Sequence, residues 1–273
     1  MNARIGIASL CMLCALLSSA FAAQSASAIT GTTAFTCVQE QGTLRGEHCL
    51  ATGTAWPAFG HVAIPQNDTT ETTTTNAKTG PETTTASGLR LKQTIAGVPL
   101  ELSATGVSGS GWIENKVVAS GEKGGEHYAH GKGTLTFTGV EVTQPAGRGC
   151  KATTDNAATE GEVGVVHSKE LTAITEGQNW KFLPAEGNVL ASFFVTCEEG
   201  KQIPTIEGTW SVTGSVKGAP EGATIKFTHT STTAEATLRT KGVKAGLEGN
   251  LTLSARANGG NLYWPVASTT VTT

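Results

Sequence analysis

Apolar and polar side chains alternate along much of the chain between residues 187 and 255, and no helical period interrupts them. In the clearest run, every second residue is apolar or glycine and the residues between them are polar. The first group lies on one side of an extended strand and consists of Ile206, Gly208, Trp210, Val212, Gly214 and Val216. A second run, over residues 243–255, repeats the pattern. Strands of this kind have one dry face and one solvated face, as in antiparallel sheets. The pattern predicts a β-meander over residues 187–255 with Trp210 in the core.

Shorter alternating runs predict further strands at 98–104, 112–118, 163–166, 171–175 and 223–228. Another run, over 189–197, places its odd-numbered residues on one face. Leu135 and Phe137 share one phase, whereas Val140 and Val142 need the opposite phase, so we expect a β-bulge at Gly139. Turn clusters of Gly and Pro separate most runs, which is typical of sandwiches and barrels. The pattern predicts no crossover helices, which a parallel α/β sheet would need. The expected fold is all-β, an antiparallel β-sandwich or a barrel-like meander.

The composition supports this expectation. The 273 residues include 44 Thr and 34 Gly, which suit pleated surfaces and turns respectively. Charged residues make up only 15% of the chain and the formal net charge is −3. That balance gives no electrostatic footprint for nucleic acid or for an acidic membrane surface.

The first 28 residues have the layout of a cleaved signal peptide, with Arg4, an apolar stretch over 5–17 and the small residues Ala26, Ser27 and Ala28. We therefore expect a secreted protein, extracellular or associated with the cell envelope. No stretch approaches the ~20 apolar residues of a transmembrane helix. The rest divides into an N-terminal β appendage, 29–96, and a main antiparallel β domain, 97–273. Within the appendage, the Thr-rich segment 67–87 predicts either an exposed hairpin turning at 76–80, which we prefer, or a linker.

Four cysteines follow the predicted signal peptide, and an even number in an exported chain favours disulfides. Three pairings are open. We prefer Cys37 with Cys49 and Cys150 with Cys197. A zinc site is disfavoured because no two of these cysteines have the short spacing of zinc ligands.

Candidate binding residues are few. Trp56 and Trp264, each beside a proline, and His61 form a candidate ligand platform, although packing is the interpretation that we prefer for each tryptophan. His127 and His130 form the best metal-like pair, but three residues apart on a strand they would face opposite sides. The G-x-S-x-G and phosphate-loop patterns are both incomplete, at 106–110 and 125–133. We expect no cofactor and assign no catalytic residue.

Several segments resemble a set of exported Gly/Thr-rich proteins of soil actinobacteria. These segments are the signal sequence ending at Ala28, residues 33–37, the His48 and Cys49 pair, residues 222–230 and residues 246–253. They are strand and turn patterns. The resemblance implies export and an all-β fold, and it carries no activity or site residue.

Three functional hypotheses are compatible with the sequence. The first is a non-enzymatic exported protein with a binding or structural role, whose partner is a surface glycan or another protein. The second is a secreted hydrolase whose Glu and His residues come together only in the fold. The third is a small-ligand carrier of barrel type, which requires an open apolar lumen instead of a filled core.

Overall fold

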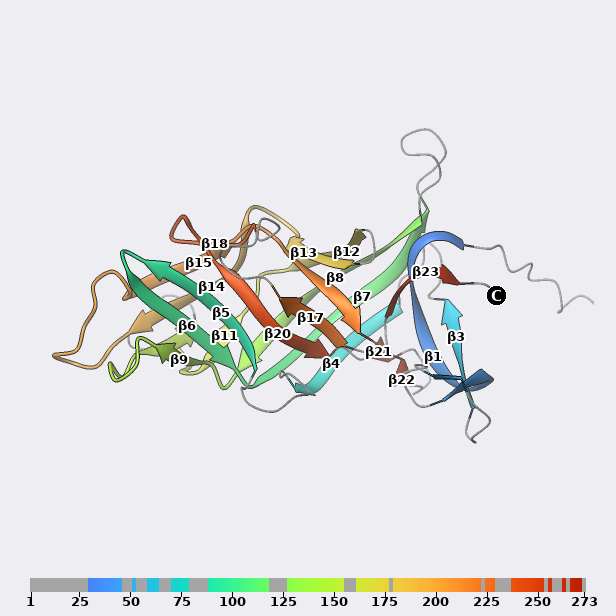
Figure 1. Cartoon of the computed structure of the whole chain (residues 1–273), viewed down its shortest axis with the longest axis horizontal. Helices are drawn as coiled ribbons and strands as arrows, with labels where there is room; N and C mark the ends of the chain where they lie inside the picture. Colours follow the sequence, from blue (N-terminus) through green and yellow to red (C-terminus); the bar gives the residue numbers. More distant parts are fainter. Residues whose placement is uncertain are drawn as a thin grey trace, which may run out of the picture.

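The computed structural model describes residues 29–45, 51–52, 58–63, 70–78, 88–117, 127–154, 161–176, 179–221, 224–228, 237–252, 255–256, 262–263 and 266–271 (Figure 1). Side chains are described within 88–116, 128–154, 161–176, 179–219, 225–228 and 237–251. Every regular element in these ranges is a β-strand. The ranges contain no helix that could cross a membrane. The predicted signal peptide lies outside them.

A large curled sheet forms most of the molecule. Its main path runs β8, β12, β13, β16, β17, β20, β5, β6 and β9, and every neighbouring pair along this path is antiparallel. The strands are β8 (His127–Thr138), β12 (Leu171–Glu176), β13 (Asn179–Pro184), β16 (Val216–Glu221), β17 (Thr224–Thr228), β20 (Gly246–Thr252), β5 (Leu89–Ile95), β6 (Val98–Ala104) and β9 (Glu141–Gln144). β7 (Gly106–Val117) pairs with β8 over its whole length, and β11 (Val165–His167) pairs with the end of β8.

The N-terminal strands belong to the same sheet. β1 (Ile29–Arg45) pairs in parallel with the start of β8, and it pairs antiparallel with β2 (Ala51–Thr52), β3 (Ala58–Ala63) and β23 (Val266–Val271). In Figure 1 these strands gather at the right-hand end of the molecule. β21 (Ala255–Arg256) and β22 (Leu262–Tyr263) form a separate pair. β4 (Thr70–Lys78), from the Thr-rich segment, pairs with β7, and residues 79–87 of the expected hairpin lie outside the described ranges.

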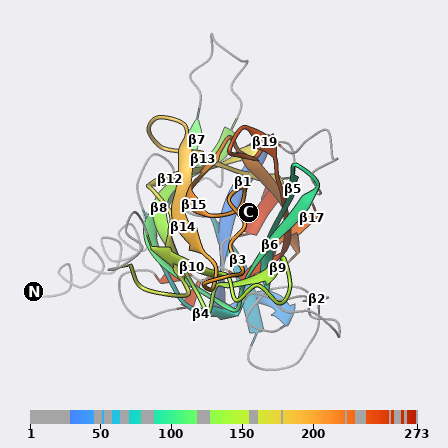
Figure 2. The same cartoon turned by 90° about the vertical axis from the view of Figure 1, so that its left-hand side faces the viewer.

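A second, smaller sheet faces the curled one. It contains β10 (Lys151–Thr154), β14 (Val189–Thr196), β15 (Gly208–Thr213), β18 (Arg239–Thr240) and β19 (Val243–Lys244). One margin is joined to the large sheet next to β11, where Ser168 forms a bridge with Ala191 and the Lys169 N–H donates to the Leu190 carbonyl. At the other margin the Thr240 hydroxyl donates to the Gln93 side-chain oxygen of β5. Viewed along the long axis, strands of both sheets surround a common interior (Figure 2).

Two facing glycines let β7 and β8 of the large sheet approach each other closely. β7 and β8 place Gly111 opposite Gly133. A Cβ at Gly111 would collide with the Lys132 carbonyl oxygen, and a Cβ at Gly133 would lie 2.5 Å from the Ser110 carbonyl oxygen. Glycine at these two positions permits a close approach of β7 and β8 that side chains would block.

Trp210 lies in the core, as its alternation predicted. It is fully buried in β15 and stacks on Phe193 of β14, with ring centroids 6.1 Å apart. Its indole N–H donates to the Ile206 carbonyl oxygen over 2.6 Å. The cross-strand pair therefore combines aromatic packing with a satisfied polar atom.

The predicted meander over 187–255 is wrong. β14 and β15 are neighbours, but the chain then crosses to the large sheet for β16 and β17, returns for β18 and β19, and crosses again for β20. The expected strand through Gly214 ends at Thr213, because Gly214 has φ +96° and turns the chain. Alternation continues in phase on both sides of Gly214, so the pattern conceals the break.

The bulge expected at Gly139 is also misplaced. Gly139, with φ +58°, lies in the bend between β8 and β9. The register instead shifts between Val189 and Ala191, so Leu190 is the extra residue of a bulge in β14. This shift breaks the expected single face of 189–197, and Leu190 itself is buried.

The boundary between the expected appendage and the main domain falls within a hairpin. β5 and β6 pair from Leu89 with Ala104 to Ile95 with Val98. Ala96 and Gly97 form the connecting turn, and both have positive φ, as a two-residue hairpin with a type I′ turn requires. β5 and β6 thus enter the large sheet together.

Candidate ligand-binding cavity

The residues singled out as a ligand platform are not brought into a described site. Trp56 and Trp264 lie outside the described ranges, as does Cys49. His61 is in β3 and Cys37 is in β1, where strand pairing is described but side chains are not. The predicted Cys150–Cys197 disulfide is present and fastens the start of β10 to the end of β14.

His127 and His130 both lie in β8, and only the side chain of His130 is described. Its Nδ1 lies 3.0 Å from Oε1 of Glu114, and its ring packs against Trp112 with centroids 5.1 Å apart. Lys116 Nζ lies 3.2 Å from the same carboxylate oxygen. Among the described residues, no three His, Cys, Asp or Glu side chains are grouped closely enough to hold a metal ion. His130 thus contacts the Glu114 carboxylate, which also forms an ion pair with Lys116.

This cluster of His130, Glu114 and Lys116 gives a prediction for Glu114→Gln. Burial acts to raise the pKa of Glu114, but hydrogen bonds from His130 and Lys116 outweigh it and hold the pKa below its ordinary value of 4.5. The carboxylate therefore contributes stability above pH 4.5, and this contribution is lost as the pH falls through the folded-state pKa. We expect Glu114→Gln to lower the free energy of unfolding by about 1 to 3 kcal/mol at pH 7, and the difference from the wild type to shrink in acid. Denaturant titrations between pH 3 and 7 measure it.

Glu170→Gln is the matched control, because Glu170 is exposed and lies 3.5 Å from Lys132. Exposed ion pairs contribute little, so this variant should follow the wild type at every pH. Equal behaviour of the two variants would contradict a stabilising role for the buried cluster.

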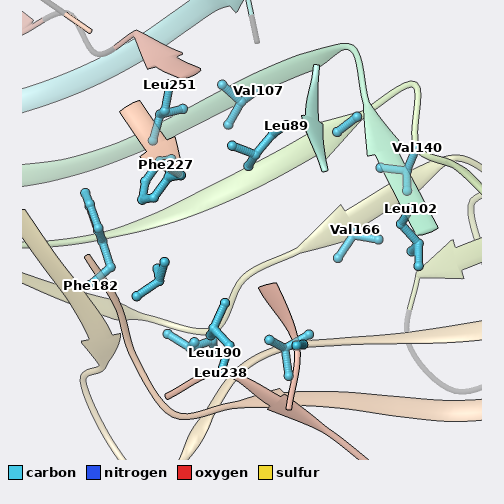
Figure 3. Close-up of a cluster of buried hydrophobic side chains, with 14 of the residues drawn as sticks. Leu89, Leu102, Val107, Val140, Val166, Phe182, Leu190, Phe227, Leu238 and Leu251 are labelled. Atoms are coloured by element: carbon cyan, nitrogen blue, oxygen red, sulfur yellow. The ribbon is translucent and has the colours of Figure 1, made fainter. Parts of the chain in front are cut away.

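The described residues place an apolar cavity of about 140 Å³ between the two sheets. Strands of the large sheet supply Leu89, Leu102, Leu135, Phe182, Phe227 and Leu251, and strands of the small sheet supply Leu190, Phe193 and Val212. Figure 3 shows such side chains approaching a shared interior from several strands, with Leu89 on one side and Leu190 and Leu238 on the other. The cavity is thus a feature of the barrel-like interior and not of a surface loop.

Strand alternation explains why these residues meet. In β5, Leu89 and Leu91 point inward, whereas Arg90 and Lys92 form ion pairs with Glu101 on the outer face. In β17, Ile225 and Phe227 are buried and Lys226 between them is exposed. These two strands therefore contribute apolar side chains to the interior and leave their charged side chains outside.

The lining is almost free of polar groups. Of the 21 described residues that line the cavity, 19 are apolar and the other two are Ser103 and Ser168. Ser168 Oγ accepts the Leu135 N–H over 2.8 Å. Ser103 is buried and has a partner within the chain. Among the described lining residues there is no acid, base or thiol, and their side chains offer mainly apolar contact.

Sequence reasoning found most of the inward-facing residues but did not find the cavity. Alternation placed Leu102, Phe193 and Phe227 on the apolar faces of expected strands. It could not show that these side chains leave space between them, because that depends on the distance between the sheets. Leu190 was missed because the bulge in β14 reverses its phase.

Comparison with known proteins returned no match, since no family model, no curated protein and no solved structure resembles the chain significantly.

Proposed function

We propose that this is an exported, non-enzymatic binding protein that holds a small apolar molecule in the cavity between its two sheets. The cavity and its apolar lining carry the proposal. The Cys150–Cys197 disulfide supports function in an oxidising compartment outside the cytosol. Of the three hypotheses, the ligand carrier is the one that required an apolar lumen.

An empty space of this size is unfavourable for the protein alone. Interiors are close-packed, and voids larger than a water molecule are few. A ligand that fills the cavity restores the missing contacts and stabilises the folded state by mass action.

The lining also favours binding over catalysis. None of the 21 lining residues is an acid, a histidine, a cysteine or a lysine. General acid–base and nucleophilic mechanisms need such groups within reach of the substrate. A bound molecule would therefore be held and released unchanged.

Filling the cavity tests the proposal. Ala104, buried in β6, lines the space, so Ala104→Leu places additional carbon atoms inside it. We expect this variant to weaken binding of toluene by at least about 10-fold, and to be as stable as the wild type or up to about 2 kcal/mol more stable, because it fills a void. Calorimetric titration and thermal unfolding in sealed cells measure the two effects.

Ala185→Leu is the control. It makes the same chemical change in the connection between β13 and β14, at a residue that does not line the cavity. Its affinity for toluene should equal that of the wild type. Ala191→Leu, at a second lining position in β14, should repeat the effect of Ala104→Leu. The proposal would be overturned if the wild type bound neither toluene nor larger apolar molecules. It would also be overturned if both lining variants bound toluene as tightly as the wild type does.

A further inference from the structure

Resting on the proposed function, we infer that the ligand is a compact, uncharged, hydrocarbon-like molecule of about six to ten non-hydrogen atoms, such as a small arene or a short hydrocarbon. Three features of the cavity carry this inference. They are its volume, the outward direction of the charges on its strands, and the scarcity of polar groups in its described lining.

The volume limits the size of the ligand. The cavity measures about 140 Å³. An engineered apolar cavity of about 150 Å³, lined by similar side chains, stays dry and takes up benzene or xenon. A ring with a short substituent therefore fits the space, whereas a molecule of twenty carbons, such as a retinoid, exceeds it.

The distribution of charge excludes an ionised ligand. On the strands that form one wall, Lys92 pairs with Glu248 at 2.6 Å and lies 4.0 Å from Glu101. Each of these charged residues adjoins an inward-facing leucine, namely Leu91, Leu247 and Leu102, and so points to the opposite face. A carboxylate or ammonium group inside would lose its hydration and meet no counter-charge.

The lining offers little even to a neutral polar group. Ser103 and Ser168 carry the only hydroxyl groups among the 21 described lining residues, and Ser168 Oγ already accepts the Leu135 N–H. A ligand hydroxyl placed among the leucines and phenylalanines would lose its hydrogen bonds to water and gain none from these side chains. Burial of an unpaired hydroxyl is unfavourable, so a hydrocarbon should bind more tightly than an alcohol of the same shape.

The test compares probes of matched shape on the full chain with its disulfide intact. Toluene and phenol differ by a methyl and a hydroxyl group, while benzoate and benzylammonium add charges of opposite sign. Retinol is a large neutral probe. We expect phenol to bind about 10-fold more weakly than toluene, and both ions at least about 100-fold more weakly. Retinol should not compete with toluene. Ala104→Leu should remove toluene binding, and this loss would show that toluene binds in the cavity.

The outcomes separate this inference from the proposed function. The inference would be overturned if benzoate, benzylammonium or retinol bound at least as tightly as toluene and this binding were lost in Ala104→Leu. The cavity would then remain a ligand site, but for another class of molecule. Phenol binding more tightly than toluene would likewise overturn it. If no probe binds the wild type, or if Ala104→Leu and Ala191→Leu change nothing, the proposed function itself fails.

Discussion

Replacing Trp210 with alanine should lower the free energy of unfolding by about 3 to 5 kcal/mol. Trp210 is fully buried, it stacks on Phe193, and its indole N–H donates to the Ile206 carbonyl. Truncation leaves a large void and an unpaired carbonyl, and it removes the support of a residue that lines the cavity. Denaturant unfolding followed by circular dichroism measures the loss without depending on the tryptophan signal.

Trp210→Phe separates packing from hydrogen bonding. It keeps an aromatic ring against Phe193 but cannot donate to Ile206, so the expected loss is about 1 to 3 kcal/mol. Lys241, whose Nζ lies 4.4 Å from the centroid of the Trp210 ring, gives a further comparison. Its side chain is exposed, so Lys241→Ala should have a much smaller effect than Trp210→Ala. A loss below about 1 kcal/mol for Trp210→Ala would contradict the buried position.

The success of the sequence at Trp210 and its failure for the meander have one physical origin. Alternation indicates which face of a strand is apolar, and it correctly assigned Trp210 to the core. It contains no information about the partner strand. β16 pairs with β13, and β20 pairs with β5 more than 140 residues away, because backbone hydrogen bonds form between strands whatever their separation in the chain.

The cavity could not be predicted for a related reason. Whether inward-facing side chains fill an interior depends on the curvature of the sheet and on the distance to the opposite sheet. Gly111 and Gly133 allow the close approach of β7 and β8, and the Leu190 bulge changes the phase of β14. In the sequence, glycines of this kind cannot be told apart from turn glycines, and the bulge leaves no mark. Local patterns therefore identified the walls, and only the assembled sheets revealed the space.

Removing the Cys150–Cys197 disulfide should also have a large effect. The bridge closes a loop with a sequence separation of 47. In the chain-entropy model a loop of this length contributes about 4 kcal/mol, so Cys150→Ala combined with Cys197→Ala should lower the free energy of unfolding by about that amount. The loop contains β10 to β14 and seven of the 21 cavity-lining residues, from Val166 to Phe193. We therefore expect weaker toluene binding at temperatures where this segment begins to unfold.

The double substitution avoids unpaired thiols and allows a clean control. Treatment of the wild type with a reductant should cause at least the same loss, whereas the same treatment of the double variant reports only what a bridge between Cys37 and Cys49 contributes. Peptide mapping of the oxidised protein identifies the pairs directly. A loss below about 1 kcal/mol would contradict the stabilising role of the bridge, and a mapped peptide that joins Cys37 to Cys197 would contradict the pairing.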